Sequence, residues 1–452
     1  MHIARPTYTA ALLLLLAFPL LAQEVRDDNL LHILHADSLV GLSSENIEAR
    51  KFIGNVRMRQ GKVHIKCDQA IQHLNKDLVE LEGNVVITQD TLTLKTRRGK
   101  YDSKNKLAST IWGIHLDDGN VTLEARTGDY NMDSRIAVFS DSVLVSEPEA
   151  AILAQDLVYY RDSSKAIATN SVYITFADET ALILADSVIH YIDAKRTYFH
   201  KSPRLWQVDT ANVERSDSLG AMEDTIRLDT LSITAKYMES IRDSADSFFA
   251  RDSVETVRTE LAARSGTMNY LRSDSLVALR FDPILWYEGS QITGDSIAVQ
   301  LANNKLHALD VFGNAFSLSA SKPTDTDSIG PPGRYDQMSG VNIFMRFKDD
   351  AAERIIVDKT AISLYYLYDD RALNGVRRES GDRIIIDFEE GDGRWIRTHS
   401  GVEGTYYPER FVTGKETSYN LEGFYLRNDR PVQPPMPAMP HPLERYREQH
   451  TP

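Results

Sequence analysis

The sequence contains one stretch whose residue types could bind a calcium ion. Asp325-Thr326-Asp327-Ser328-Ile329-Gly330 begins like a calcium-binding loop, in which oxygen ligands alternate along the chain. However, Ile329 occupies the place of the third oxygen ligand, and Asp336 stands where such a loop requires a glutamate. The mismatch favours an ordinary solvated loop.

Histidines offer two further pairs of metal-ligand type, His32 with His35 and His190 with Asp193. A zinc site needs three or four ligands, and the remaining histidines are scattered along the chain. We therefore expect surface or turn histidines, no metal site and no cofactor.

Motifs for covalent catalysis or nucleotide binding are absent from the sequence, including Gly-x-Ser-x-Gly, Gly-x-x-x-x-Gly-Lys and Gly-x-Gly-x-x-Gly. The many aspartates stand mainly at predicted turns, where their preference for turns accounts for them. We predict that the protein is not an enzyme. The basic residues Lys95, Arg97, Arg98 and Lys100 could contact phosphates, or they could form a solvated strand face that discourages edge pairing.

Composition sets limits on the partner and on the degree of folding. The chain has 452 residues and a net charge of −14, which argues against a general nucleic-acid-binding surface. With 42% hydrophobic and 9% aromatic residues, it can bury a core and lacks the composition of a disordered protein.

Residues 1–22 have the features of a secretory signal peptide: Arg5, an apolar run from Ala10 to Leu16, and Ala22 before a polar residue. We therefore expect an exported protein, with a retained membrane anchor as the alternative. The single cysteine, Cys67, cannot form an intramolecular disulfide and alternates with apolar residues, which predicts a buried strand position.

Internal self-similarity is the strongest signal in the sequence. Five motifs begin 29 residues apart: Gly54-Asn55-Val56, Gly83-Asn84-Val85, Trp112-Gly113-Ile114, Asp141-Ser142-Val143 and Asn170-Ser171-Val172. A second series has the same spacing: Gly99-Lys100-Tyr101, Gly128-Asp129-Tyr130 and Leu157-Val158-Tyr159. The chain is therefore predicted to be built from units of about 29 residues.

Between these motifs apolar and polar residues alternate, as in Val63-His64-Ile65-Lys66-Cys67, which is typical of half-buried strands. Residues of turn type separate the runs, for example Asn75-Lys76-Asp77 and Asp117-Asp118-Gly119-Asn120. At about 3.3 Å per residue, a strand of about ten residues spans roughly 33 Å. The pattern predicts an all-β fold, an elongated antiparallel layer of strand-turn-strand units.

The pattern weakens after residue 200 and then returns, since residues 311–318 match residues 357–364 at Val, Ala, Ser and Leu. The expected organisation is a signal peptide (1–22), a first β module (31–208), a polar insertion or linker (209–230), a second β region (231–320), a loop (321–338), a C-terminal β region (339–428) and a disordered Pro-rich tail (431–452).

Three stretches resemble the OstA-like, or organic solvent tolerance, family: Leu-Glu-Gly-Asn-Val-Val-Ile at 81–87, Arg-Gly-Lys-Tyr-Asp at 98–102 and His-Ala-Asp at 35–37. The resemblance covers residues 31–205 and is weaker over residues 225–425. It implies a periplasmic β-jellyroll, or β-taco, of the lipopolysaccharide transport bridge. In that family lipid A acyl chains slide along an apolar groove without bond chemistry.

The resemblance also implies partners. They are lipopolysaccharide or a related glycolipid, other jellyroll components of the bridge and an outer-membrane barrel, joined through edge strands, with self-association as a further option. It leaves open a soluble bridge in the periplasm, an adaptor at the outer membrane, or a relative that handles another lipid. A structural scaffold of β-repeats without lipid transfer is the alternative function.

Apolar residues of the alternating runs are the candidates for a lipid groove, and ordinary core is the alternative interpretation. The candidates are Val63, Ile65, Ile87, Leu92, Leu94, Val121, Leu123, Val143, Val145, Ile174, Phe176, Leu182 and Leu184.

Overall fold

The computed structural model describes residues 29–44, 47–177, 181–216, 222–242, 246–302, 305–322, 331–348, 351–369, 372–389 and 392–450. The predicted signal peptide and the calcium-like stretch at 325–330 lie outside these residues. Within the described residues, no helix is both long and apolar enough to span a bilayer.

The described elements are almost all strands. The first half contains β1 (His32–His35), β2 (Ser38–Ser44), β3 (Ile47–Gln60), β4 (Val63–His73), β5 (Leu78–Gln89), β6 (Leu92–Asp102), β7 (Leu107–Thr110), β8 (Ile114–Asp117), β9 (Thr122–Ala125), β10 (Thr127–Asn131), β11 (Ile136–Ser146), β12 (Ala150–Tyr160), β13 (Lys165–Phe176), β14 (Ala181–Tyr191) and β15 (Arg196–His200), with a 3-10 turn at Arg161–Ser163.

The second half contains β16 (Arg204–Ser216), β17 (Met222–Thr234), β18 (Tyr237–Ile241), β19 (Ser247–Val257), β20 (Leu261–Leu271), β21 (Leu276–Arg280), β22 (Ile284–Tyr287), β23 (Ser290–Thr293), β24 (Ser296–Ala302), β25 (Lys305–Ala320), β26 (Tyr335–Lys348), β27 (Ala351–Asp369), β28 (Ala372–Glu389), β29 (Asp392–His399) and β30 (Glu403–Pro408). Helix α1 (Glu409–Val412), a 3-10 turn (Glu416–Tyr419) and helix α2 (His441–His450) follow.

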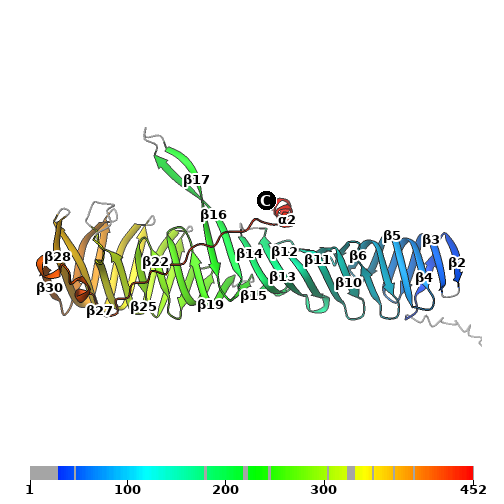
Figure 1. The fold of residues 1–452 in the computed structure, drawn as a ribbon, viewed down its shortest axis with the longest axis horizontal. Coiled ribbons are helices and arrows are strands. Elements are labelled where there is room, and N and C mark those ends of the chain that lie inside the picture. Colours follow the sequence, from blue (N-terminus) through cyan, green and yellow to red (C-terminus); the bar gives the residue numbers. More distant parts are fainter. Residues whose placement is uncertain are drawn as a thin grey trace, which may run out of the picture.

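The thirty described strands form one antiparallel sheet in which successive strands pair along a long rod (Figure 1). Strands β1 and β2 pair with β3 at one end, and β29 and β30 pair with β28 at the other. The prediction of an elongated, all-β antiparallel jellyroll is confirmed. The predicted module boundaries stay a prediction.

Each long strand bends near its middle, and the motifs at 29-residue spacing lie at these bends. The register shifts between Ile53 and Val56 in β3, where Gly54 and Asn55 both have positive φ, at 82° and 46°. Gly and Asn tolerate this left-handed conformation better than most residues. At the equivalent Gly83, a Cβ atom would lie 2.3 Å from Asp68 Oδ2. Close approach and backbone geometry together explain the glycine.

The bends fold the sheet into two arms whose inner faces share one hydrophobic core. This core is a single cluster that extends from Phe52 in β3 to Ile384 in β28. Because side chains alternate across a strand, every second residue contributes to it. The arms thus enclose a long apolar interior.

The described part of the predicted polar insertion or linker, residues 209–216 and 222–230, belongs to a β-hairpin insertion. Strands β16 and β17 pair from Arg204 with Thr234 to Ser216 with Met222, and the hairpin projects from the side of the rod (Figure 1). Its β-branched residues and alternating pattern outweigh the Asp- and Ser-rich composition that suggested a linker. The predicted loop at 321–338 is also shorter, because β26 begins at Tyr335.

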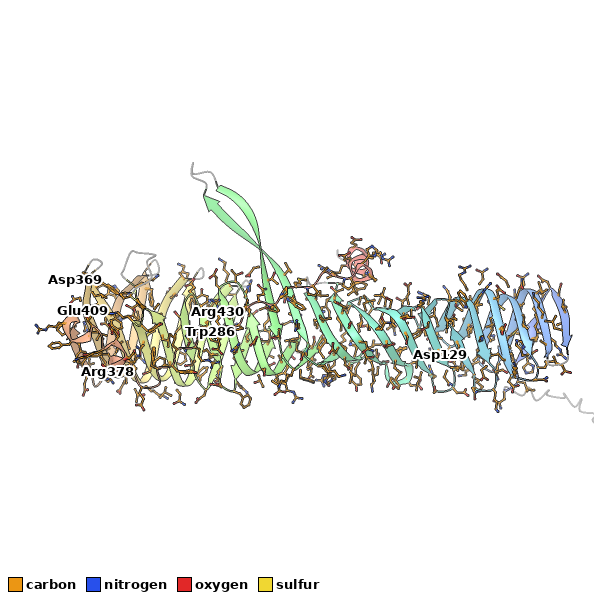
Figure 2. The ribbon with its side chains drawn as sticks, viewed as in Figure 1. Asp129, Trp286, Asp369, Arg378, Glu409 and Arg430 are labelled. Atoms are coloured by element: carbon orange, nitrogen blue, oxygen red, sulfur yellow. The ribbon has the colours of Figure 1, made fainter. Side chains whose placement is uncertain are left out.

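The predicted disordered tail is ordered over its described part. Residues 409–450, here called the C-terminal strap, run back along the outside of the rod from β28 to α2, which contacts β12 and β13 (Figure 1). Figure 2 shows Glu409, the first strap residue, at the far end of the rod. Composition suggested disorder, but Leu443 and Tyr446 of α2 are buried against the sheet.

Candidate functional site

The apolar interior contains eleven of the thirteen predicted groove residues. All eleven are buried members of the main core cluster: Val63, Ile65, Ile87, Leu92, Leu94, Val121, Leu123, Val143, Val145, Ile174 and Phe176. They come from both halves of the first six units and face one another across the interior. Their contact with lipid stays a prediction.

The other two predicted groove residues lie on the opposite face of β14. Ala181, Ile183 and Ala185 face the main core, so Leu182 and Leu184 between them point outward. Leu182 packs in a separate cluster with Leu443 of α2. The placement of Leu182 and Leu184 in the groove was therefore wrong. Because β14 is apolar on both faces, its sequence does not indicate which residues face the interior.

Along one side of the rod the turn ends of the two arms meet, and hydrogen bonds join them. We call this line the seam. The Tyr101 hydroxyl donates to Gln60 Oε1 at 2.7 Å, and Gln60 Nε2 donates to the Ser103 carbonyl at 2.7 Å. Tyr130 and Gln89 repeat the first contact at 3.3 Å. Both residues of the first pair are buried, so each bond satisfies groups that would otherwise lack a partner.

Further along the seam the contacts involve carboxylates. The Tyr159 hydroxyl donates to Asp118 Oδ2 at 2.6 Å, and burial together with this carboxylate raises the pKa of Tyr159. His190 Nε2 lies 3.2 Å from Glu147 Oε1, while His190 Nδ1 lies 2.9 Å from the Thr197 hydroxyl. Gln60, Gln89, Asp118 and Glu147 are spaced 29 residues apart. The seam is thus closed by side chains and not by backbone pairing.

The final seam contact of this series is a stacked cation. The Arg242 guanidinium carbon lies 3.8 Å from the centre of the Phe176 ring, and Phe176 follows Glu147 by a further 29 residues. Such a cation over an aromatic face is attracted by the electron-rich ring. Between Glu147 and this stack, the seam is less tightly closed.

The interior is closely packed in the first units and contains a cavity at the looser part of the seam. A void of only about 10 Å³ lies between Val85, Ile87 and Leu94. A larger cavity of about 310 Å³ lies at the seam, lined by Glu147, Pro148, Glu149, Ala150, Ile152, Ile174, Phe176, His190, Ile192, Lys195, Thr197 and Arg242, with Gly119 and Asn120.

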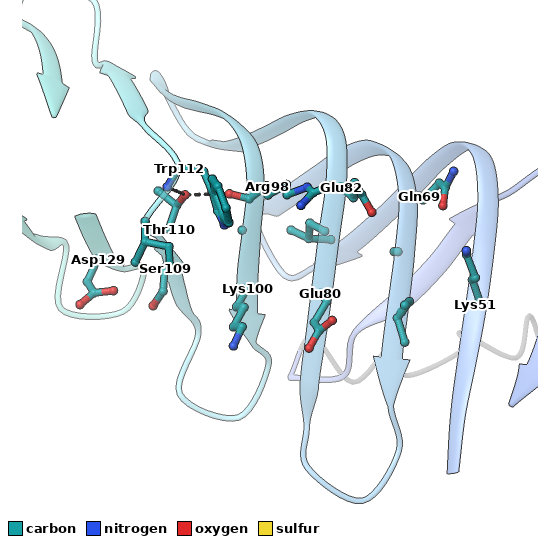
Figure 3. Close-up of a pocket in the computed structure, with 15 residues that line it drawn as sticks. Lys51, Gln69, Glu80, Glu82, Arg98, Lys100, Ser109, Thr110, Trp112 and Asp129 are labelled. Carbon is teal, nitrogen blue, oxygen red and sulfur yellow. Dashed lines mark hydrogen bonds and ion pairs between the residues drawn. The ribbon is translucent and has the colours of Figure 1, made fainter. Parts of the chain in front are cut away.

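The basic residues Lys95, Arg97, Arg98 and Lys100 lie on the outer surface. Arg98 forms an ion pair with Glu82 and lies over Trp112, 5.7 Å from the ring centre. Figure 3 shows Arg98, Lys100, Glu80 and Glu82 along neighbouring strands, beside a hollow of about 460 Å³. Because carboxylates alternate with the cations, this face resembles a solvated strand surface more than a phosphate site.

The outer face of the rod also bears an apolar stripe that the sequence analysis missed. This outer stripe includes Ala151, Leu182, Trp206, Ile284, Trp286, Phe316, Leu318, Leu364 and Tyr366. Its strands are apolar on both faces and read as continuous runs, such as Ala181-Leu182-Ile183-Leu184-Ala185. Such runs are the signal that could have revealed it.

The C-terminal strap is fastened along this stripe by buried side chains of the sheet. Gln291 Nε2 donates to the Tyr425 carbonyl at 2.7 Å, and the Arg427 amide donates to Gln291 Oε1 at 2.8 Å. Gln337 holds the strap in a similar way through the Leu421 amide at 2.9 Å. The Trp206 indole donates to the Pro434 carbonyl at 3.0 Å.

Near its start, the strap is also held by charge. The Arg334 guanidinium is almost fully buried and donates to both carboxylate oxygens of Glu409, at 2.9 and 2.6 Å, and to Glu416 at 3.1 Å. The Arg334 hydrogen bonds hold the pKa of Glu409 below its usual range. For Glu416, hydrogen bonds from the backbone amides of Glu416 and Gly414 do most to lower the pKa. Burial raises the pKa of the nearby Asp336 to about 6, although its carboxylate accepts a bond from the Tyr366 amide at 2.9 Å.

The remaining candidate residues occupy ordinary positions. His35 contacts Asp37 at 3.1 Å on the surface, and His190 belongs to the seam. Among the described residues, no group of three potential metal ligands occurs. Cys67 is buried as predicted, and burial raises the pKa of its thiol to about 12, which keeps it protonated and unreactive.

Comparison with known protein families gives a match over the first part of the rod. A profile of the family described as OstA-like protein matches residues 28–183. These residues are similar to that family. The predicted resemblance is confirmed over this segment, which includes the first five bends and the seam contacts of Tyr101, Tyr130 and Tyr159.

Solved structures and curated sequences were compared as well. Twelve chains of solved structures match, among them LptH of Pseudomonas aeruginosa, the LptA-homologous periplasmic component of the lipopolysaccharide transport device. LptH is 11% identical, the TM-score is 0.25, and the match covers 33% of this chain and 95% of LptH. No curated protein sequence matches the chain.

Proposed function

We propose that the protein is an exported, non-enzymatic lipid carrier that takes part in moving lipopolysaccharide across the periplasm to the outer membrane. The observation that carries this proposal is the continuous apolar interior between two arms that only side chains join at the seam. The arms can separate without breaking the hydrogen bonds between strands. The OstA-like match of residues 28–183 supports the same function.

Acyl chains would replace contacts that the two arms make with each other. Opening one seam contact such as Tyr101 with Gln60 costs about 1 kcal/mol for each net hydrogen bond. Apolar burial returns roughly 25 cal/mol for each Å² removed from water, so a lipid chain between the arms can offset this cost. Sugars and phosphates would remain at the seam in water.

The two ends of the sheet are the proposed docking surfaces for other jellyroll proteins, for an outer-membrane barrel or for a second copy. Exposed apolar side chains lie at both ends, with Leu39 in β2 and Trp395 in β29 exposed by 60% and 66%. Edge strands bear unpaired backbone groups that favour strand addition.

The first test is native mass spectrometry and lipid extraction of the protein purified from the periplasm of its own cells. We expect lipopolysaccharide or a related glycolipid to co-purify. A photo-crosslinking residue placed at Ile183, inside the interior, should label this lipid. The same residue at Leu184, its outward-facing neighbour in β14, is the matched control and should not.

A structural scaffold is the second candidate, and the close packing around Ile87 and Leu94 favours it. A protein that carries no lipid, and that still associates with copies of itself, would support the scaffold and contradict the carrier. Lipid that co-purifies but labels Ile183 and Leu184 equally would show that the interior is not its binding site.

A further inference from the structure

The cavity of about 310 Å³ at the seam combines a charged rim with an apolar floor. Its floor contains Ile152 and Ile174, which pair across β12 and β13 and belong to the main core. Its rim contains Glu149 and Lys195, one from each arm. The cavity therefore leads from solvent directly to the apolar interior.

The outer contact that joins the two arms at this cavity is exposed to water, whereas the neighbouring contact of His190 with Glu147 is largely buried. Lys195 Nζ lies 2.7 Å from Glu149 Oε1, and these side chains are 51% and 59% exposed. Exposed ion pairs contribute little to stability. The earlier contact of Tyr101 with Gln60 instead joins two buried side chains, which are costly to leave without partners.

The cavity has room for part of a lipid only. A volume of about 310 Å³ is near the lower limit of about 300 Å³ for small-molecule pockets. Ile152, Ile174 and Phe176 supply the hydrophobic contact that an acyl chain needs, and Lys195 and Arg242 stand where an acidic headgroup would remain.

We propose that this cavity is a lateral port, at which one acyl chain of an acidic amphiphile enters the interior between the Glu147–Ala150 turn and the arm that bears His190 and Lys195. The port rests on the proposed carrier function, and it assigns a place on the side of the rod to lipid uptake or release. The interior is then accessible at its side as well as at its ends.

Ala150 offers a direct test, because it lines the cavity, is only half-buried and leaves room for a larger side chain. We expect Ala150→Leu and then Ala150→Trp to fill the port and progressively weaken binding of cis-parinaric acid, a fluorescent single-chain fatty acid. For Ala150→Trp the affinity should fall about tenfold or more. The full-length protein is titrated, and circular dichroism and thermal melting verify its fold.

The matched control is Lys62→Trp, which adds the same indole at the exposed turn three units earlier, outside the cavity lining. Its affinity should equal that of the unmodified protein. If Ala150→Trp fails to fold, Ala150→Leu decides the matter. Binding that is unchanged in every folded Ala150 variant overturns the port.

A second pair of variants tests the rim. Lys195→Gln should weaken binding of cis-parinaric acid and leave binding of its neutral alcohol unchanged. Lys106→Gln is the control, because Lys106 occupies the same positive-φ turn position and also pairs with a carboxylate, at Asp133. Equal effects of the two variants would contradict an acidic headgroup at this rim.

Failure of the port differs from failure of the carrier function. If lipopolysaccharide co-purifies but filling the cavity changes neither its amount nor fatty-acid binding, the port is wrong and the carrier stands. If the unmodified protein binds neither lipopolysaccharide nor cis-parinaric acid, both proposals fail.

Discussion

At the residue scale, some buried polar side chains join the two arms at the seam, and others join the strap to the sheet. Tyr101, Gln60 and Gln291 each have a hydrogen-bond partner on a segment distant in sequence. Apolar residues there would close the seam or fasten the strap more permanently. Hydrogen bonds fix one geometry. Replacing them by hydrogen bonds to water costs little net free energy.

Replacing the Tyr101 hydroxyl tests the seam. In Tyr101→Phe the buried Gln60 Oε1 loses its hydrogen-bond donor, so we expect the free energy of unfolding to fall by about 1 to 3 kcal/mol. Hydrogen exchange at the amides near Gln60 and Ser103 should become faster. Tyr160→Phe, whose ring lies beside Lys165 at the surface, should change neither quantity, and an equal effect would contradict a role for the seam bond.

Asp336 predicts a pH dependence of stability. Its pKa is raised by burial to about 6 from 3.8, so between these values the folded state keeps a proton that the unfolded state has released. Stability therefore falls as pH rises through this window, and the loss is complete above about pH 6. Asp336→Asn lacks the carboxyl but can still accept the Tyr366 amide bond.

The measurement is the melting temperature of both proteins at pH 4 and pH 7.5. Between pH 4 and pH 7.5, the free energy of unfolding of the unmodified protein should fall by about 1 to 3 kcal/mol relative to that of Asp336→Asn. A constant difference across the range would show that the carboxyl of Asp336 is not buried in its acid form.

Sequence reasoning at this scale found the seam tyrosines but not what they do. Tyr101, Tyr130 and Tyr159 were visible as a spacing. Their partners have the same 29-residue spacing, but they lie 41 residues earlier and differ in residue type, so the sequence alone did not link the two series. For Leu182 and Leu184 the alternation was real but its phase was ambiguous, since neighbouring Ile183 is equally apolar.

At the scale of elements, regular strands and their turns were predictable, and the elements that cover them were not. Positive-φ bends favour Gly, Asn, Asp or Ser at fixed spacing, so bends such as the one at Gly83 and Asn84 can leave a recognisable pattern in the sequence. The strap leaves none, because its partners Gln291 and Gln337 lie more than eighty residues away.

Helix α2 should depend strongly on Leu443, one of its two side chains buried against the sheet. Leu443→Asp places a charge among Ala151 and Leu182, which should release α2 from the sheet. Trypsin should then cut at Arg445 and Arg447 at least about tenfold faster, while β-sheet circular dichroism is unchanged. Trypsin should cut the Glu448→Gln variant, whose substitution lies on the exposed side of α2, at the rate of the unmodified protein. Equal cutting of both would show that Leu443 does not hold the helix.

At the scale of the whole molecule, the rod has two apolar surfaces with different closures. The interior is closed by the two arms, and the outer stripe is covered in part by the strap. Repeated units stack with nearest neighbours, so stability is expected to be nearly a sum over units and unfolding need not be a single transition.

Ending the chain after Phe424 tests this arrangement. It removes α2 and the Pro434 contact but leaves the Arg334 ion pairs in place. With Trp206 and Leu182 exposed, we expect self-association at micromolar concentration, measured by light scattering against the full-length chain. A monomer that matches the full-length protein would show that the strap does not shield the stripe.

The position of the strap has a consequence for biogenesis. Helix α2 packs on β12 and β13, so a part of the chain made late completes a surface made much earlier. Until α2 has been made, it cannot cover the apolar residues around Leu182, however well the strands have paired. A stalled or truncated chain would expose these apolar residues, and chaperones and proteases can recognise such a surface. The strap thereby lets a full-length rod be distinguished from a partial one.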